Sequence, residues 1–240
     1  MAAFSDNEFP PRYSYCGYSG PAQWPNIVIE GKKNECGGTR QSPISLPSPS
    51  PTGGPGIGVE YIAGDATIRN TGHNILVTPA GDAGKITIGE NVYKLVEFHF
   101  HAPGEHSIPG VAAVAEMHIV HQRVKGSGDE TAVIGVMLTK GDEYAALKPV
   151  FANIPETVCA APKALLQINF DKLLSQPFAY YTYAGSLTTP PCTPSVTWYV
   201  VGTPQTILES DWKKLHALGE NARPIQSNRP PLPVTYVRPQ

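Results

Sequence analysis

The sequence has few of the features that mark nucleic-acid-binding, membrane-spanning or glycosylated proteins. Lys and Arg total 18 against 20 acidic residues, so a net charge of -2 provides no basic surface for nucleic acid or anionic lipid. No apolar run approaches the roughly 20 residues that span a bilayer. Residues 1–6 lack the basic and apolar regions of a secretory signal, and no Asn-x-Ser/Thr acceptor occurs. We therefore expect no nucleic-acid partner, no membrane span and no N-glycosylation.

Cysteine is scarce and its spacing is uninformative. The four cysteines, Cys16, Cys36, Cys159 and Cys192, include no C-x-x-C unit, so a cysteine-bound zinc is not expected. Three fully paired connectivities exist for four cysteines. Composition alone leaves open whether they form disulfides in an oxidising compartment or remain free thiols.

The chain has the size of one domain and the pattern of a sheet. At 240 residues we expect a single domain over 1–240, with loose termini at 1–12 and 231–240. Helical patterns are confined to residues 142–154 and 209–218. Regularly spaced runs of β-branched and aromatic residues predict a large, mainly antiparallel sheet, and hence a mainly β (α+β) fold. These runs are Val59–Tyr61, Ile75–Thr78, Lys85–Ile88, Val92–His101, Ala113–His121, Ala132–Leu138 and Val196–Val201.

The most informative segment is a set of histidines and acids between residues 97 and 118. Residues two apart in a strand share a face, so Glu97, His99 and His101 would point one way. On a second strand, Glu116 and His118 would likewise share a face. Two antiparallel neighbours could then bring three imidazoles together, with carboxylates beside them.

A His-x-His pair alone is more often a surface or hydrogen-bonded pair than a metal site. The third histidine on a second strand, with acidic residues in phase on both strands, favours the metal interpretation. Three His ligands and one open position are typical of catalytic zinc. Flanking carboxylates suit the groups that orient such ligands.

Further motifs extend this pattern along most of the chain, from about residue 15 to about residue 230. They are residues 20–25, 41–44 (Gln-Ser-Pro-Ile), 70–73 (Asn-Thr-Gly-His), 98–101, 105–106, 115–118, 185–191, 196–198 and 221–226. Each motif is modestly specific, but the ordered set is very specific. With this set the sequence resembles the α-class carbonic anhydrases.

The resemblance implies a fold and an activity. The fold would be a single domain around a twisted, mostly antiparallel sheet of about ten strands, with short peripheral helices. The activity would be reversible hydration of carbon dioxide to bicarbonate and a proton by zinc-bound hydroxide, with one zinc per chain and weak esterase activity on the side. His99, His101 and His118 would be the zinc ligands.

The resemblance also implies roles for residues around the zinc. Thr188 would accept the hydroxide's hydrogen and donate its own to Glu105, because a hydroxyl has one donor and two acceptor sites. His73 would be the proton shuttle. Beside the ligands, Glu116 would support His118, the backbone carbonyl of Asn221 would support the second ligand, and Glu97 stands where the family commonly has glutamine. Tyr15, Asn70 and Thr189 would order water, and Val120, Val133, Leu187 and Trp198 would form the apolar wall that receives carbon dioxide.

By the same resemblance, Cys36 and Cys192 match a disulfide of extracellular and periplasmic family members. Cys16 and Cys159 have no firm counterpart, and either form a second bridge or remain free. We therefore expect a secreted, extracellular or periplasmic protein, either monomer or homodimer. The family implies inhibition by sulfonamides and small anions.

Two other functions compete with this interpretation. One is a non-catalytic, carbonic-anhydrase-like binding module, which typically lacks a ligand histidine. The other is a zinc hydrolase with larger substrates, which the small aliphatic pocket disfavours. A structural role in mineral deposition would need acidic or repetitive tracts, and the sequence has none.

Overall fold

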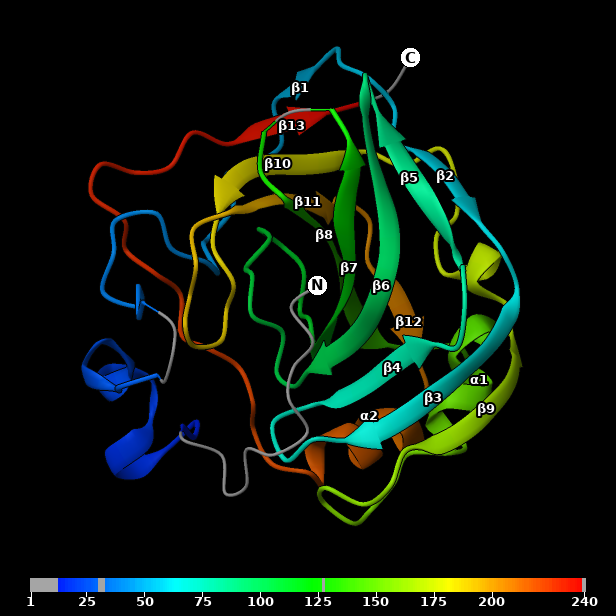
Figure 1. Ribbon diagram of the computed structural model, residues 1–240. Coiled ribbons are helices and arrows are strands. Elements are labelled where there is room, and N and C mark those ends of the chain that lie inside the picture. Colours follow the sequence, from blue (N-terminus) through cyan, green and yellow to red (C-terminus); the bar gives the residue numbers. More distant parts are fainter. Residues whose placement is uncertain (1–12, 30–32, 127, 239–240) are drawn as a thin grey trace.

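A computed structural model describes residues 13–29, 33–126 and 128–238 (Figure 1). The stretch 1–12, expected to be a loose terminus, lies outside these residues. The described strands form one 13-stranded sheet, in which a continuous path runs β1-β13-β10-β11-β8-β7-β6-β4-β3-β9. Most neighbours are antiparallel, whereas β8 pairs in parallel with β11 and β12, and β1 pairs in parallel with β13. The prediction of a large, mainly antiparallel sheet is confirmed.

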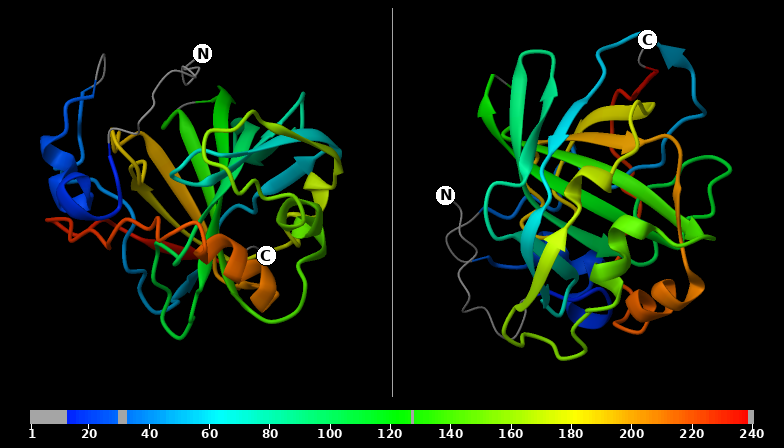
Figure 2. Two further views of the ribbon diagram at one scale, coloured as in Figure 1. Left: turned by 90° about the horizontal axis from the view of Figure 1, so that it is seen from below. Right: turned by 90° about the vertical axis from the view of Figure 1, so that its right-hand side faces the viewer.

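The strands vary widely in length, and the longest three are adjacent in the middle of the sheet. The bounds are β1 Pro51–Thr52, β2 Gly58–Tyr61, β3 Gly64–Asn70, β4 Ile75–Pro79, β5 Gly84–Ile88, β6 Asn91–His101, β7 Ala115–Lys125, β8 Thr131–Lys140, β9 Lys163–Ile168, β10 Tyr180–Gly185, β11 Val196–Val201, β12 Gln205–Ile207 and β13 Thr235–Val237. Figure 2 shows the strong twist of this sheet and the helices at its periphery.

The central pair β6–β7 separates a polar face from an apolar one. The antiparallel register sets His99 opposite His118 and Phe98 opposite Ile119. Because side chains alternate along a strand, Phe98 and Phe100 point into the main core, where they are 0% and 2% exposed. The histidines are thereby left on the other face, as the alternation predicts.

Helices are short. The structure has 3₁₀ turns η1 Gly17–Ser19, η2 Pro21–Asn26, η3 Ala145–Leu147 and η4 Phe170–Lys172, with helices α1 Lys148–Phe151 and α2 Glu209–His216. The helix expected over 209–218 is thus present as α2, with Gly219 at φ +94° just beyond it. None of the described helices is long and apolar enough to cross a membrane.

The prediction of a helix over 142–154 was wrong in extent, because only η3 and the four-residue α1 form there. Pro149 lies in the first turn of α1, where proline is tolerated, but Ile154 precedes Pro155 and is therefore disfavoured in a helix. The expectation of a loose end over 231–240 was also wrong in part. Residues 235–237 form β13, which pairs with β10 and β1.

Candidate active site

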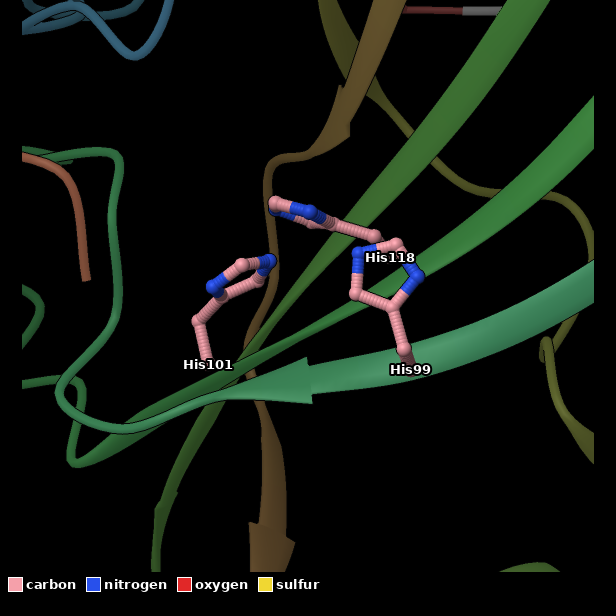
Figure 3. A group of neighbouring side chains, drawn as sticks. All are labelled: His99, His101 and His118. Carbon is pink, nitrogen blue, oxygen red and sulfur yellow. The ribbon is translucent and has the colours of Figure 1, made fainter. Parts of the chain in front are cut away.

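Three imidazoles meet on the polar face of β6 and β7 (Figure 3). His99 and His101 come from the end of β6, and His118 faces them from β7. One nitrogen from each ring lies within 4.8 Å of the corresponding nitrogen of the other two. His101 and His118 are buried, while His99 is partly exposed at the open side. The register of one strand pair therefore assembles the whole group.

The remaining nitrogen of each ring has a protein partner. His99 Nδ1 lies 3.0 and 2.9 Å from the two carboxylate oxygens of Glu97. His101 Nδ1 donates to the backbone carbonyl of Asn221 at 2.7 Å. His118 Nε2 lies 3.0 Å from Glu116 Oε1. These contacts fix each ring's orientation and leave the inward nitrogen with a free lone pair, which is how metal-ligating histidines are commonly supported.

The protonation of these rings also suits a metal. Burial lowers the pKa of His101 well below its ordinary value and lowers that of His118 to about 4, so both are neutral at neutral pH. His101 Nε2 is buried and has no hydrogen-bond partner in the described part of the chain. A buried polar atom without a partner is costly. Three imidazole nitrogens around one point, two of them on rings that burial keeps neutral, fit a zinc ion.

A second set of possible ligands, His106, Glu116 and His118, does not fit a metal in the same way. His106 Nδ1 lies 2.7 Å from Glu116 Oε1, and His106 Nε2 lies 2.6 Å from the Tyr183 hydroxyl. Both nitrogens of His106 are therefore occupied. Although burial acts to raise the pKa of Glu116, the adjacent His106 and His118 hold it well below its usual range. This set is a buried network that supports His118 from behind.

Glu105 and Thr188 lie beside the imidazoles. Glu105 is buried, and its Oε1 accepts a 2.8 Å hydrogen bond from the backbone N–H of Arg223. Among the described residues, no group makes a well-aligned hydrogen bond to its Oε2. The Thr188 hydroxyl is nevertheless near enough to the carboxyl group to lower the pKa of Glu105. Burial dominates and raises this pKa well above its usual range. Nearby positive charge, from Arg223 or from a metal, would favour the carboxylate.

His73 lies on the turn between β3 and β4. Its ring stacks on Tyr13, with centroids 3.9 Å apart and planes at 8°, and meets Tyr15 edge-on at 6.2 Å. Burial lowers its pKa from the ordinary value of 6.5. Its backbone carbonyl accepts a 2.7 Å hydrogen bond from Asn221 Nδ2, so the turn is connected to the residue that supports His101.

The three residues predicted to order water differ in their surroundings and contacts. The hydroxyl of Tyr15 is buried, and this burial raises its pKa well above the usual value. Asn70 is also buried, but its amide bonds to the Pro155 carbonyl and the Gly72 N–H, so its described contacts hold the turn rather than face the imidazoles. Thr189 contributes a backbone carbonyl that accepts from Cys192 N–H.

The predicted apolar wall forms one cluster next to the histidines. Val133 and Trp198 are 2% and 1% exposed, and the partly buried Val120 and Leu187 pack against the same cluster. The Trp198 ring lies 4.7 Å from His118, measured between centroids. An apolar surface therefore adjoins the imidazole group.

The cysteines divide into a bridged pair and two free residues. Cys36 and Cys192 form a disulfide, as the resemblance implies. It joins the N-terminal part of the chain to the loop after Thr188. Cys16 and Cys159 are free and exposed, so the alternative of a second bridge is not what the structure contains.

Two residues that contact this region were not predicted from the sequence. Arg223 was noted only as part of a motif, yet its guanidinium donates to the carbonyls of Cys36 and Ser42 while its N–H holds Glu105. Tyr13, which stacks on His73, was not identified at all. A tyrosine two residues before another carries no periodic or spacing signal that could have revealed it.

Comparisons with known proteins agree with this geometry. The family model for eukaryotic-type carbonic anhydrase matches residues 19–236. A carbonic anhydrase of Klebsiella pneumoniae is 35% identical over 223 residues, covering 91% of this chain and 88% of that protein.

Two solved structures share the fold. The α-carbonic anhydrase of Thermovibrio ammonificans, solved with the inhibitor sulfanilamide, has a TM-score of 0.82 and 30% identity, covering 94% of this chain and 98% of its own. A dioscorin complexed with ascorbate also has a TM-score of 0.82, at 28% identity, covering 96% and 99%. The family match, together with the imidazole group on β6 and β7, shows that this chain belongs to the eukaryotic-type, α-class carbonic anhydrases and is an enzyme of that class.

Proposed function

We propose that this chain hydrates carbon dioxide reversibly to bicarbonate and a proton, using one zinc ion held by His99, His101 and His118. The observation that carries the proposal is the meeting of three imidazole nitrogens within 4.8 Å, one of them buried without a partner. α-Class carbonic anhydrases are zinc enzymes, so the donor set and the family agree.

A bound zinc ion would supply water of lowered pKa, about 7 instead of 15.7, a value established for carbonic anhydrase itself. The chain would orient that water. Thr188 can accept one hydrogen bond while donating its own hydrogen to Glu105, so an ionised Glu105 imposes a direction on the hydroxyl. Arg223 N–H, at 2.8 Å from Glu105 Oε1, favours the ionised carboxyl.

His73 would carry the released proton away from the site. Burial lowers its pKa, so the ring stays neutral, and therefore able to accept a proton, to a lower pH than a free imidazole does. Its partly buried ring, set against Tyr13 and Tyr15, lies between the interior and solvent. This position is suitable for a relay.

The apolar cluster of Val120, Val133, Leu187 and Trp198 would receive carbon dioxide, which has no net charge or dipole to satisfy. A small apolar wall disfavours bulky substrates, and weak hydrolysis of esters would follow from the same nucleophile. Sulfonamides should inhibit, since the T. ammonificans α-carbonic anhydrase was solved with the inhibitor sulfanilamide. Small anions should inhibit as well, as the family implies.

The Cys36–Cys192 disulfide supports a location in an oxidising compartment, either extracellular or periplasmic. Disulfides rarely persist in the reducing cytosol. Electrophoresis under reducing and non-reducing conditions would test this location, by showing in which cell fraction the protein carries the disulfide.

A stopped-flow assay of carbon dioxide hydration, with and without a zinc chelator, tests the proposed function. We expect zinc-dependent turnover that returns when zinc is added back. If the protein binds one zinc per chain but has no activity above the uncatalysed rate, the proposal is wrong. That outcome would favour a carbonic-anhydrase-like binding module, and binding of ascorbate, the ligand in the dioscorin structure, would then be the first measurement to make.

A further inference from the structure

Asn221 connects two parts of the site through its side chain. Its backbone carbonyl accepts from His101 Nδ1 at 2.7 Å, and any residue type could supply that carbonyl. Its side chain makes three more hydrogen bonds. Oδ1 accepts from Ala102 N–H at 2.7 Å, and Nδ2 donates to the carbonyls of Phe100 at 2.9 Å and His73 at 2.7 Å.

These contacts need an asparagine side chain. An amide carries an acceptor and two donors, and here both N–H groups meet carbonyls while the oxygen meets an N–H. Aspartate would retain the acceptor but offer no donor, and alanine would lose all three bonds. The side chain therefore has a task separate from the support of His101.

The task concerns the turn that carries His73. Within the turn, Gly72 has φ +82° and its N–H is held by Asn70, while Thr71 Oγ1 bonds to the Asn74 carbonyl and side-chain oxygen. These bonds shape the turn. The pairing of β4 with β6, which sets Leu76 opposite His99, holds the β4 end of the turn against β6. At His73 itself, the bond from Asn221 Nδ2 to the His73 carbonyl joins the turn to β6, because Asn221 is simultaneously bonded to residues 100, 101 and 102 at the end of β6.

We propose that the Asn221 side chain is a positioning residue that sets the distance between His73 and the three-histidine group, and with it the rate of proton transfer. The inference rests on the proposed function, since it assigns a structural basis to the shuttle. Misplacement of a reacting group by about 1 Å can lower a rate by about a hundredfold. Proton transfer should therefore be sensitive to Asn221, the residue that joins the His73 turn to the end of β6.

The substitution Asn221→Asp tests this with minimal change in shape. The aspartate keeps the acceptor for Ala102 N–H and the backbone carbonyl for His101, but presents an oxygen to the Phe100 and His73 carbonyls. Asn74→Asp is the matched control. It places the same charge in the His73 turn, and its carboxylate can still accept the Thr71 hydroxyl, which is 2.8 Å from Asn74 Oδ1.

We would measure kcat and kcat/KM for carbon dioxide hydration in weak buffer, and amide hydrogen exchange of residues 70–76 in the zinc-free protein. For Asn221→Asp we expect kcat to fall about tenfold with kcat/KM changed less than twofold, recovery in imidazole buffer, and faster exchange in the turn. Asn74→Asp should leave both kinetic constants and the exchange near those of the unmodified protein.

Other outcomes overturn the inference. Equal losses in kcat and kcat/KM would mean that the side chain serves the ligand His101 instead. Unchanged kcat and exchange would mean that the bond to His73 has no role, and equal effects of both substitutions would mean that charge alone matters. An inactive unmodified protein with zinc bound would instead contradict the proposed function itself.

Discussion

The imidazole group and the groups that would act with it are held by different kinds of structure. His99 and His118 lie directly opposite each other on adjacent strands, and His101 lies two residues further along β6, within the regular part of the β6–β7 ladder. His73, Thr188 and Asn221 lie on separate loops and reach the site through contacts distant in sequence. The regular part depends on the sheet, whereas the loop part depends on a few individual hydrogen bonds and one disulfide.

This difference predicts how each part responds to mutation. Removal of a strand-borne ligand should strongly weaken metal binding while the sheet remains intact, because most of the sheet's hydrogen bonds are made by backbone atoms. Changes in the loop part should leave zinc in place and alter individual rate constants. The following predictions separate the two parts, from the largest expected effect to the smallest.

His101→Ala should have the largest effect. Loss of a ligand should weaken zinc binding by more than the roughly 10- to 100-fold that loss of a supporting group costs, and hydration activity should disappear. Competition with a colorimetric chelator measures the zinc affinity. The control His216→Ala removes an exposed histidine that stacks on Trp212, and should bind zinc normally. Tight zinc binding by His101→Ala would contradict the three-ligand assignment.

Thr188→Ala should lower kcat/KM by about a hundredfold, the scale found when one positioned hydrogen-bonding group is removed from an active site. Zinc affinity should change little, because Thr188 is in the loop part. Thr188→Ser keeps the hydroxyl and should retain most activity. Equal losses in the two variants would mean that packing of the threonine methyl, not its hydroxyl, is what matters.

His73→Ala should lower kcat by on the order of tenfold in weak buffer, because solvent and buffer partly replace the relay, while kcat/KM is retained. Added imidazole should restore part of the loss. Burial lowers the His73 pKa, so the neutral, proton-accepting ring persists to lower pH and the acid limit of kcat in the unmodified protein should lie below 6.5. Full turnover by His73→Ala without added buffer would refute the shuttle.

Glu97→Gln should have the smallest effect. A carboxylate 2.9 to 3.0 Å from His99 Nδ1 is a stronger acceptor than an amide, so it should make His99 a more basic ligand. We expect up to about tenfold weaker zinc binding, and a shift of the pH–activity profile to lower pH by less than about one unit. An unchanged profile together with unchanged affinity would show that the carboxylate is equivalent to glutamine here.

The elements that could be predicted from the sequence were those whose residue types follow a regular local pattern, such as alternation along a strand. The alternation of Glu97, His99 and His101 against Phe98 and Phe100 is visible in the sequence, and the sheet requires it to become two faces. The runs that became β2, β4, β5, β6, β7, β8 and β11 were likewise found. Strands β3 and β9 were missed because their segments mix charged, polar and helix-favouring residues, and β13 was missed because it is only three residues long. These segments gain strand structure from neighbouring strands.

The loop-borne residues could be predicted only through the resemblance to a family. Nothing local in the sequence brings Thr188 to Glu105 or His73 to Asn221, since these contacts close very long loops. Tyr13 and Arg223 also could not be predicted from local sequence. Their contacts with His73 and Glu105 are made between segments whose approach depends on the whole fold.

The sequence by itself determined which residues can share a face of β6 and of β7, because side-chain alternation is a property of the strand backbone. It thereby determined that histidines and acids would lie together on one side of the pair. The tertiary structure decided which strands became neighbours, that Cys36 rather than Cys16 meets Cys192, and that Asn221 lies between His73 and His101. Those pairings depend on long-range packing and loop closure, for which no short segment carries the information.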